Sequence, residues 1–334
     1  MRTVKPLVTV GIPIYFNSEI PWYNCSEALR NTLNSITKQT YNNLEIIISD
    51  NHSVGDEIKD IAKEFMVKDK RIKYFKQRKN IGGRKNYDFL LKKSKAKYFM
   101  WAPADDQWDR TYIEKCMNKF LQDDSIGLVF SKCEIASISN KKFNTFNSKI
   151  NFCDFTHLNN SEIISLFILM SNSFHLETMI YGIWKRKLLI EAFEINFHLI
   201  EKYSHINFNG RPPPTDPAWI VYILINIKIY QIPEKLYVRR YRFVVPHSKR
   251  SKIHGIKTKI RKFHNLSYYK EVYDFNIVSN KMIEDILDIF AVQDKKIRNM
   301  LYFQKILFLL PVEIRNPFIL LLASSILTKE KLIN

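Results

Sequence analysis

Two adjacent aspartates, Asp105 and Asp106, come shortly after the short apolar segment from Tyr98 to Trp101. Carboxylate oxygens are hard ligands that suit a divalent cation carrying a diphosphate, and a strand end holds such ligands rigidly. The pair therefore predicts a nucleotide-using enzyme. Aspartate is also common in turns and at helix N-caps, so Asp109 could simply cap the helix expected from about Arg110.

The segments before this pair alternate between two patterns. Short apolar runs rich in β-branched residues predict strands, and apolar residues at helical spacing predict helices between them. The expected elements are, in order, residues 7–15, 26–36, 44–48, 58–65, 72–75, 87–91 and 98–101. This alternation predicts the α/β class, with a mostly parallel central sheet and helices on both faces.

Polar residues follow each of the four expected strands. They are Tyr15 and Asn17, Asp50 to Ser53, Asn80 to Arg84, and Asp105 with Asp106. In a doubly wound sheet these loops can converge on one crevice beyond the carboxyl ends of the strands. Two of these loops have a simpler explanation: Asp50 could form an Asx-turn, and Gly82 could only make a turn. Gly82 could equally let backbone amides approach a phosphate.

The second half of the chain has weaker patterns. We expect a fifth strand at 127–134, a helix at 163–170, a short strand at 179–184 and an Ile-Pro strand near 232–233. A proline-rich loop at 209–219 opens an apolar helix at 218–227.

Several ordered motifs make the chain resemble the inverting family 2 glycosyltransferases, whose GT-A domain binds a nucleotide-diphospho-sugar. The matching segments are Val8 to Asn17, Ser35 to Tyr41, Glu45 to Ser53, Asn80-x-Gly82 with Asn86, and Ala104-Asp-Asp106. The resemblance implies a Rossmann-like GT-A domain at residues 1–245, with a nucleotide-sugar half at 1–134 and an acceptor half at 135–245. A basic, mostly helical region at 246–334 follows.

The resemblance also implies roles for single residues. Asp50 would contact the uracil or ribose, and Pro13 and Tyr15 would border the base. The full set of expected nucleotide-sugar-binding residues is Pro13, Tyr15, Asn17, Asp50, Asn51, Ser53, Asn80, Gly82, Arg84, Asn86 and Asp105. For Mn²⁺ or Mg²⁺ we expect Asp106 as the main ligand and Asp105 as a sugar, ribose or metal contact. Pro103 stands where the family has its first acidic residue, so water would complete the metal site.

A catalytic acidic residue commonly starts the apolar helix in this family, and Asp216 matches that position. Inverting transfer needs one general base to take the proton of the acceptor hydroxyl. The alternative is that Asp216, standing before Pro217, only caps the helix. Glu177, Glu194 and Glu201 are the other candidates for the base.

The expected function is therefore transfer of a hexosyl or N-acetylhexosaminyl group, from a UDP-sugar above all, to a glycan or lipid-linked hydroxyl. Bacterial synthesis of capsule, O-antigen or lipooligosaccharide is the expected setting. One alternative is a sugar-phosphate nucleotidyltransferase, although Tyr15-Phe-Asn17 stands where its Gly-rich loop would be. Another is a non-catalytic basic protein that binds nucleic acid or anionic lipid, although no nucleic-acid-binding signature is evident.

The net charge of +19 calls for an acidic partner, and residues 235–270 contain no Asp or Glu. This segment and the apolar runs at 306–310 and 317–327 could bind the anionic inner face of the cytoplasmic membrane. Core packing and a homo-oligomer contact are the alternatives for those runs. We expect no nucleic acid partner. Four cysteines without a C-x-x-C pair, and no signal peptide, favour a cytoplasmic protein.

Overall fold

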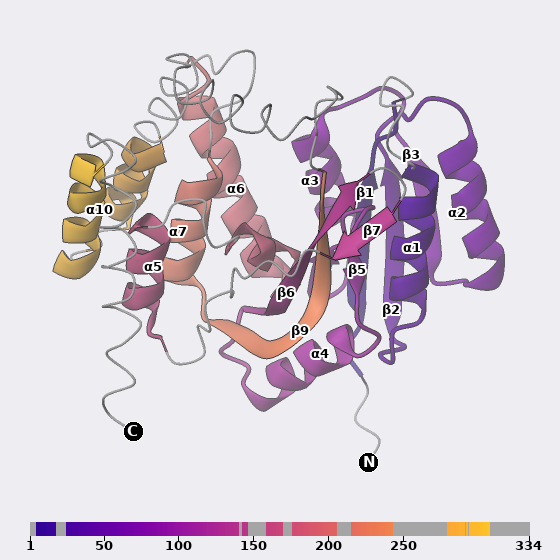
Figure 1. Cartoon of the computed structure of the whole chain (residues 1–334), viewed down its shortest axis with the longest axis horizontal. Coiled ribbons are helices and arrows are strands. Elements are labelled where there is room, and N and C mark those ends of the chain that lie inside the picture. Colours follow the sequence, from indigo (N-terminus) through magenta and orange to yellow (C-terminus); the bar gives the residue numbers. More distant parts are fainter. Residues whose placement is uncertain are drawn as a thin grey trace, which may run out of the picture. The chain divides into compact units, whose positions relative to one another are not determined.

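The computed structural model describes residues 5–17, 25–139, 142–145, 158–169, 176–205, 215–242, 279–290, 292 and 294–307. Its centre is a nine-stranded mixed sheet in the order β3-β2-β1-β4-β8-β6-β9-β5, with β7 paired to β6 (Figure 1). The first four strands are β1 (Val8–Ile14), β2 (Leu44–Asp50), β3 (Ile72–Lys76) and β4 (Tyr98–Trp101). They pair in parallel, so their carboxyl ends meet at one edge.

Helices connect these strands, as parallel pairing requires. They are α1 (Cys25–Thr37), α2 (Glu57–Lys68), α3 (Gly83–Lys93) and, after β4, α4 (Tyr112–Gln122). Figure 1 shows α1 and α2 beside β1, β2 and β3. All seven residues of β1 are buried, which is typical of a strand covered on both faces. A side chain at Gly11 would come within 2.8 Å of the Phe99 ring, so Phe99 would have to shift to admit it.

The later strands extend the sheet beyond β4. They are β5 (Gln107–Trp108), β6 (Leu128–Ser139), β7 (Lys142–Thr145), β8 (Ile183–Lys185) and β9 (Ile229–Arg242). Strand β8 is antiparallel to both β4 and β6, and β9 runs parallel to β6 with register shifts around Lys132. Strand β9 also pairs with β5, which brings Val238 opposite Gln107. The end of β9 therefore lies directly beside Asp106.

The chain forms two compact units. The first contains Met1–Thr156, His175–Phe193 and Ile227–Arg242, and the second contains His157–Phe174, Glu194–Asn226 and Phe243–Asn334. In the second unit α5 (Asn160–Leu169) packs against α7 (Asp216–Asn226) and α10 (Lys295–Leu307). Helix α6 (Arg186–Lys202) begins in the first unit and ends in the second.

The α/β class and the four parallel strands predicted from the sequence are confirmed. The short strand predicted at 179–184 is wrong in its bounds, because Leu176–Tyr181 is a 3₁₀ turn and β8 starts only at Ile183. Helix α6, β5 and β7 were not predicted. The domain boundary at residue 245 stays a prediction. Parts of three predicted segments lie outside the described residues: 209–214 of the loop, 243–270 of the basic segment, and 308–310 and 317–327 of the apolar runs.

Among the helices that the structure describes, none combines the length and apolar character needed to cross a membrane.

Candidate functional site

Asp50 ends β2 and is buried, with 1% of its surface exposed. One carboxylate oxygen, Oδ1, accepts the Ser53 backbone N–H at 2.7 Å. The other, Oδ2, accepts the Tyr74 hydroxyl at 2.6 Å. Burial and the hydrogen bond to Asp50 raise the pKa of Tyr74 well above its usual value, so this hydroxyl stays a donor. The carboxylate is thus held in one orientation.

Hydrogen bonds join the loop after β1 to the loop after β2. The backbone N–H of Phe16 donates to the Ser53 hydroxyl at 2.8 Å, and the carbonyl of Phe16 accepts the Val54 N–H at 3.1 Å. The N–H of Asn51 donates to the Ile14 carbonyl at 2.8 Å. Two of the four predicted loops are therefore one connected structure.

The loop after β3 joins the same network through two asparagines. Asn51 donates from Nδ2 to Asn80 Oδ1 at 2.8 Å and accepts the Ile81 N–H at 2.9 Å. Asn80 Oδ1 also accepts the Gly82 N–H at 2.8 Å. Gly82 has φ +83°, a conformation that favours glycine, and it directly precedes α3. The start of α3 is therefore fixed beside the ends of β2 and β3.

Asn86 lies on α3 and is buried against β2, with 2% of its surface exposed. Its Oδ1 accepts the Ser49 hydroxyl at 2.6 Å, and its Nδ2 donates to the Ser49 carbonyl at 3.0 Å. The sequence indicated Asn51, Ser53, Asn80 and Asn86 as nucleotide contacts. The structure brings all four to the predicted edge, where Asn51, Ser53 and Asn80 connect the loops and Asn86 bonds to Ser49 of β2.

Other predicted residues offer surface to a ligand at this edge. Tyr15 is 46% exposed, while Asn17 and Arg84 are each partly exposed. Pro13 is buried within β1 and borders the edge through its backbone. Tyr15, Asn17 and Arg84 are therefore the predicted residues best placed for direct contact.

The Asp105-Asp106 pair follows β4 at the same edge, and Asp106 is its buried member, with 2% exposed. Asp106 Oδ1 accepts the Arg240 backbone N–H at 2.8 Å, and Oδ2 accepts the Tyr237 hydroxyl. The Asp106 carbonyl accepts the Thr32 hydroxyl at 2.8 Å. Burial and the neighbouring charge of Asp105 raise the pKa of Asp106 to about 7, although the Tyr237 hydrogen bond opposes that shift.

Asp105 differs from its neighbour because it is partly exposed. Asp105 is therefore better placed than the buried Asp106 to meet a cation from solvent. The expectation that Asp106 is the main ligand stays a prediction. Among the described residues, no group of three or more His, Cys, Asp or Glu side chains could enclose a metal ion. A cation would therefore be shared between Asp105, diphosphate oxygens and water, as Mg²⁺-type sites commonly are.

A cation stands close to the acidic pair. The Arg239 guanidinium carbon lies 5.7 Å from the centre of the Tyr181 ring, and its charge lowers the pKa of Asp106. Burial raises the pKa of Tyr181 to about 12, so that hydroxyl stays neutral. Sequence reasoning missed Tyr237 as a site residue, because 131 residues separate it from Asp106.

Asp216 belongs to the second unit and is exposed in the first turn of α7. Thr215 directly precedes the helix: its carbonyl accepts the Trp219 N–H at 3.0 Å, and its hydroxyl donates to Asn196 Oδ1 at 2.8 Å. Thr215 thus fills the cap position that was the alternative role for Asp216. Glu194 and Glu201 are exposed on α6.

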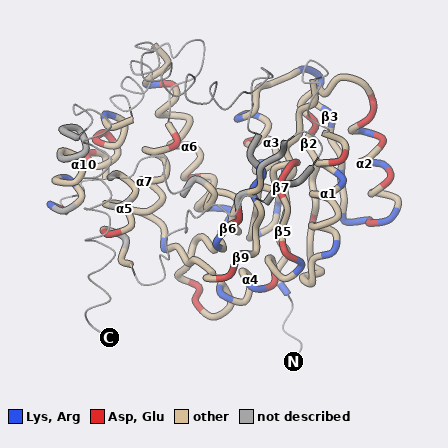
Figure 2. The backbone as a smooth tube through the Cα atoms, in the orientation of Figure 1, with Lys and Arg blue, Asp and Glu red and all other residues tan. Residues whose placement is uncertain are grey.

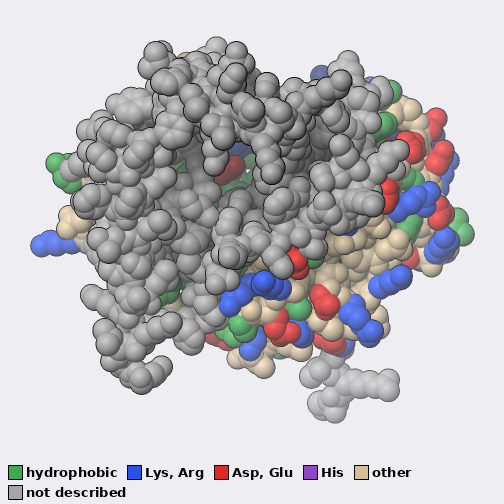
Figure 3. Space-filling view, viewed as in Figure 1, with side chains coloured by type: hydrophobic (Ala, Val, Ile, Leu, Met, Phe, Trp, Pro, Cys, Tyr) green, Lys and Arg blue, Asp and Glu red, His purple; other side chains and the backbone are tan. Residues whose placement is uncertain are grey.

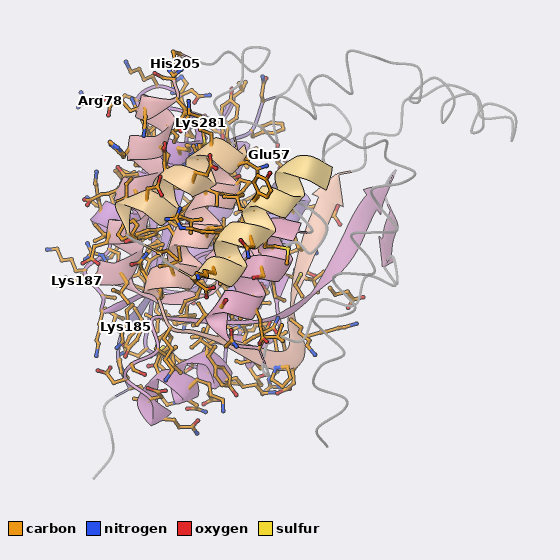
Figure 4. The ribbon with its side chains drawn as sticks, turned by 90° about the vertical axis from the view of Figure 1, so that its left-hand side faces the viewer. Glu57, Arg78, Lys185, Lys187, His205 and Lys281 are labelled. Atoms are coloured by element: carbon orange, nitrogen blue, oxygen red, sulfur yellow. The ribbon has the colours of Figure 1, made fainter. Side chains whose placement is uncertain are left out.

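Charges of both signs are spread over the surface of the first unit. Basic and acidic residues alternate along α2 (Figure 2), and the described surface seen in Figure 3 shows Lys and Arg among Asp and Glu. Lys97 and Lys185 both pair with Asp124, at 3.6 Å and 3.0 Å. Lys187 points away from the ribbon (Figure 4). Of the basic segment at 235–270, residues 235–242 are described, and they form part of β9.

Comparison with known proteins gives consistent matches. Residues 20–171 match the family model described as Glycosyl transferase family 2. The chain is 32% identical over 115 residues to Glycosyltransferase GlyA of Streptococcus pneumoniae, which is 34% of this chain and 16% of that protein. It is 32% identical over 109 residues, 33% of this chain and 42% of the relative, to the UDP-Glc:alpha-D-GlcNAc-diphosphoundecaprenol beta-1,3-glucosyltransferase WfaP of Escherichia coli.

A longer match reaches further along the chain. Glycosyltransferase GlyG of Streptococcus pneumoniae is 26% identical over 230 residues, or 67% of this chain and 69% of that protein. Among solved structures, residues 1–349 of S. aureus TarS in complex with UDP-GlcNAc superpose with a TM-score of 0.46 at 13% identity. That superposition covers 84% of this chain and 71% of the other. The chain spans less than half the length of GlyA and of WfaP.

Proposed function

Because this chain belongs to the family 2 glycosyltransferases, we propose that it transfers a sugar from a nucleoside diphosphate sugar to a hydroxyl group, with inversion. The fold fits this role. It is the mixed α/β GT-A type, with the parallel strands β3-β2-β1-β4 presenting their carboxyl ends at one edge. In sheets of this kind, ligands bind beyond that edge.

One observation carries the proposal: Asp50 ends β2 and Asp105 comes after β4, and these two strands flank β1 on its two sides. Their strands are two strand spacings apart, roughly 10 Å. That separation suits a nucleoside beside Asp50 and a diphosphate beside Asp105. The hydrogen bonds of Ser53 and Asn51 fix the loop beside Asp50, and the hydrogen bonds of Asp106 fix the turn that carries Asp105.

Mn²⁺ or Mg²⁺ would fit beside Asp105 and would supply positive charge to the leaving diphosphate. The protein adds its own charges, because Arg239 lies close to the acidic pair and Arg84 lies in the first turn of α3. Backbone amides at the start of a helix also favour a phosphate. These groups are in place before the reaction, which is the arrangement that lowers the barrier most.

Asp216 is our proposed general base. The acceptor oxygen attacks the anomeric carbon, its proton passes to the Asp216 carboxylate, and the bond from that carbon to the diphosphate breaks. The sugar thus moves in one displacement, and the nucleoside diphosphate leaves with the electron pair. The exposure of Asp216 and the presence of Thr215 at the cap position support this role.

We propose a UDP-sugar as donor, carrying a hexosyl or N-acetylhexosaminyl group, and a glycan or lipid-linked acceptor in bacterial surface-glycan synthesis. The name of WfaP gives that relative a UDP-sugar donor and a diphosphoundecaprenol acceptor, which supports this choice. A lipid-linked acceptor would place the protein at the inner face of the cytoplasmic membrane. The basic composition supports such a surface.

The test is thermal stabilisation by UDP, GDP, TDP, CMP and ADP, each with Mn²⁺ and with a chelator. A ligand that binds only the native state raises the melting temperature. We expect stabilisation by UDP that depends on Mn²⁺. Selective stabilisation by TDP or GDP would keep the reaction class and change the donor. A flat response to all five nucleotides would overturn the proposed function.

A further inference from the structure

Strand β3 and the residue that follows it hold Asp50 at two points. The Tyr74 hydroxyl donates to Asp50 Oδ2 at 2.6 Å, and the Gln77 backbone N–H donates to the Asp50 carbonyl at 2.8 Å. The strands pair in parallel with Ile48 opposite Tyr74, so the ring reaches two residues along its neighbour to meet the carboxylate. Tyr74 therefore fixes the Asp50 side chain from the neighbouring strand.

We propose that Tyr74 is a positioning residue that sets the nucleobase preference of the donor site. A carboxylate can accept about four hydrogen bonds, and the structure assigns one to Tyr74 and one to Ser53. The lone pairs that remain are therefore aimed in fixed directions. A fixed carboxylate accepts from a base whose pairing edge carries a ring N–H, as uracil, thymine and guanine do.

The same carboxylate rejects the other bases. Cytosine and adenine present a ring-nitrogen lone pair where uracil has its N–H, and two acceptors facing each other repel. This discrimination requires that the Asp50 carboxylate cannot rotate away from the base. Burial keeps the Tyr74 hydroxyl protonated, so it continues to hold Asp50 at any ordinary pH.

The inference rests on the proposed function, because it concerns the base of a nucleotide donor. The competing explanation is that Tyr74 and Asp50 only stabilise the fold. In that case the loss of the hydroxyl would lower stability and leave the choice between nucleotides unchanged. Base discrimination is therefore the readout that separates the two.

The experiment measures the dissociation constants of UDP and CDP by titration calorimetry in the presence of Mn²⁺. We compare wild type, Tyr74→Phe and the control Tyr41→Phe. Tyr41 suits the control because its hydroxyl donates to the Pro6 carbonyl at 2.5 Å and its ring is 2% exposed. Both substitutions thus remove one hydrogen-bonded hydroxyl from the first unit, and only one of them touches Asp50.

We expect wild type and Tyr41→Phe to share one preference for UDP over CDP. In Tyr74→Phe the preference should fall about tenfold, the size expected for one lost hydrogen bond to a charged group. The KM for the donor should rise while kcat changes little, because Asp50 acts on binding of the base. Melting curves of both variants check that they are folded.

Asp50→Asn gives a second measurement that stays informative if Tyr74→Phe is unstable. This variant should lose the preference for UDP over CDP. Adding Tyr74→Phe to it should leave the ratio of the two dissociation constants unchanged. A preference in Tyr74→Phe equal to that of wild type would overturn the inference and leave the proposed function standing. A further loss on adding Tyr74→Phe to Asp50→Asn would also overturn it. Wild type that binds neither nucleotide would overturn both.

Discussion

Asp50 and Asp106 are both buried aspartates at the carboxyl edge of the sheet, and the same kinds of donor hold them. Each carboxylate accepts one backbone N–H and one tyrosine hydroxyl: Ser53 and Tyr74 for Asp50, Arg240 and Tyr237 for Asp106. The two differ in where those donors come from. The donors of Asp50 lie within 24 residues of it, whereas those of Asp106 lie more than 130 residues away.

The difference indicates different tasks. Asp50 is held within one βαβ unit and has no acidic neighbour in sequence. Asp106 ties the turn after β4 to the end of β9, and Asp105 stands beside it, partly exposed. We infer that Asp106 is a support that presents Asp105. We propose that the buried carboxylate contacts the ligand in one region and that its partly exposed neighbour does so in the other.

Asp105→Asn should have the largest effect. If Asp105 meets the metal and the diphosphate, turnover should fall about a thousandfold or more, the range seen when a stabilising group for developing charge is removed. The free energy of unfolding should stay unchanged or rise, because Asp105 repels the buried Asp106. Steady-state kinetics and chemical denaturation measure the two quantities. A variant with nearly full activity would exclude Asp105 from the site.

Tyr237→Phe should have the next largest effect. Asp106 would lose its hydroxyl donor while it stays buried, which should cost about 1–3 kcal/mol of unfolding free energy. Turnover should fall about tenfold or more, because the turn that carries Asp105 would shift. Steady-state kinetics of Tyr237→Phe and Tyr74→Phe should be compared. Tyr74→Phe should alter the KM and the base preference instead of kcat. Equal effects of both on kcat would remove the distinction between the two regions.

Chelation of metal should weaken UDP binding about tenfold in wild type and in Asp50→Asn. It should have little effect on Asp105→Asn, in which the metal contact is already lost. Titration with UDP in Mn²⁺ or in chelator measures this. Metal dependence that survives in Asp105→Asn would move the metal to another group.

Asn80→Ala should have the smallest effect. Its side-chain oxygen accepts from Asn51 and from the Gly82 N–H at a largely exposed position, so its loss should cost about 1 kcal/mol. The KM for the donor should rise a few-fold, and kcat should hold. Thermal melting and donor titration give both values. A large fall in kcat would mean that Asn80 touches the reacting groups.

The Asp50 region could be predicted from sequence because everything that builds it is local. Apolar runs mark β1, β2 and β3, and the polar loops follow them directly. The roles of Asn51 and Asn86 were harder to predict, since a polar residue at a strand end can bind a ligand or a neighbouring loop. Only the structure shows that Asn51 bonds to the loop after β3 and that Asn86 bonds to Ser49 of β2.

The support for Asp106 could not be predicted in the same way. Strand β9 reaches the acidic pair through pairing with β5 and β6, and its register shifts near Lys132 decide which residues face Asp106. No local pattern specifies that register. The separation of Asp105 and Asp106 into an exposed and a buried member was therefore missed, while the pair itself was found from its position after β4.

The most direct test of this account is a crystal structure of the chain with UDP and Mn²⁺. We expect the metal on an Asp105 oxygen and the diphosphate, Asp106 still bound by Tyr237 and Arg240, and the uracil ring N–H on Asp50. A metal bound by Asp106 with Tyr237 displaced, or a nucleotide bound away from the carboxyl edge of β1, β2 and β4, would contradict it.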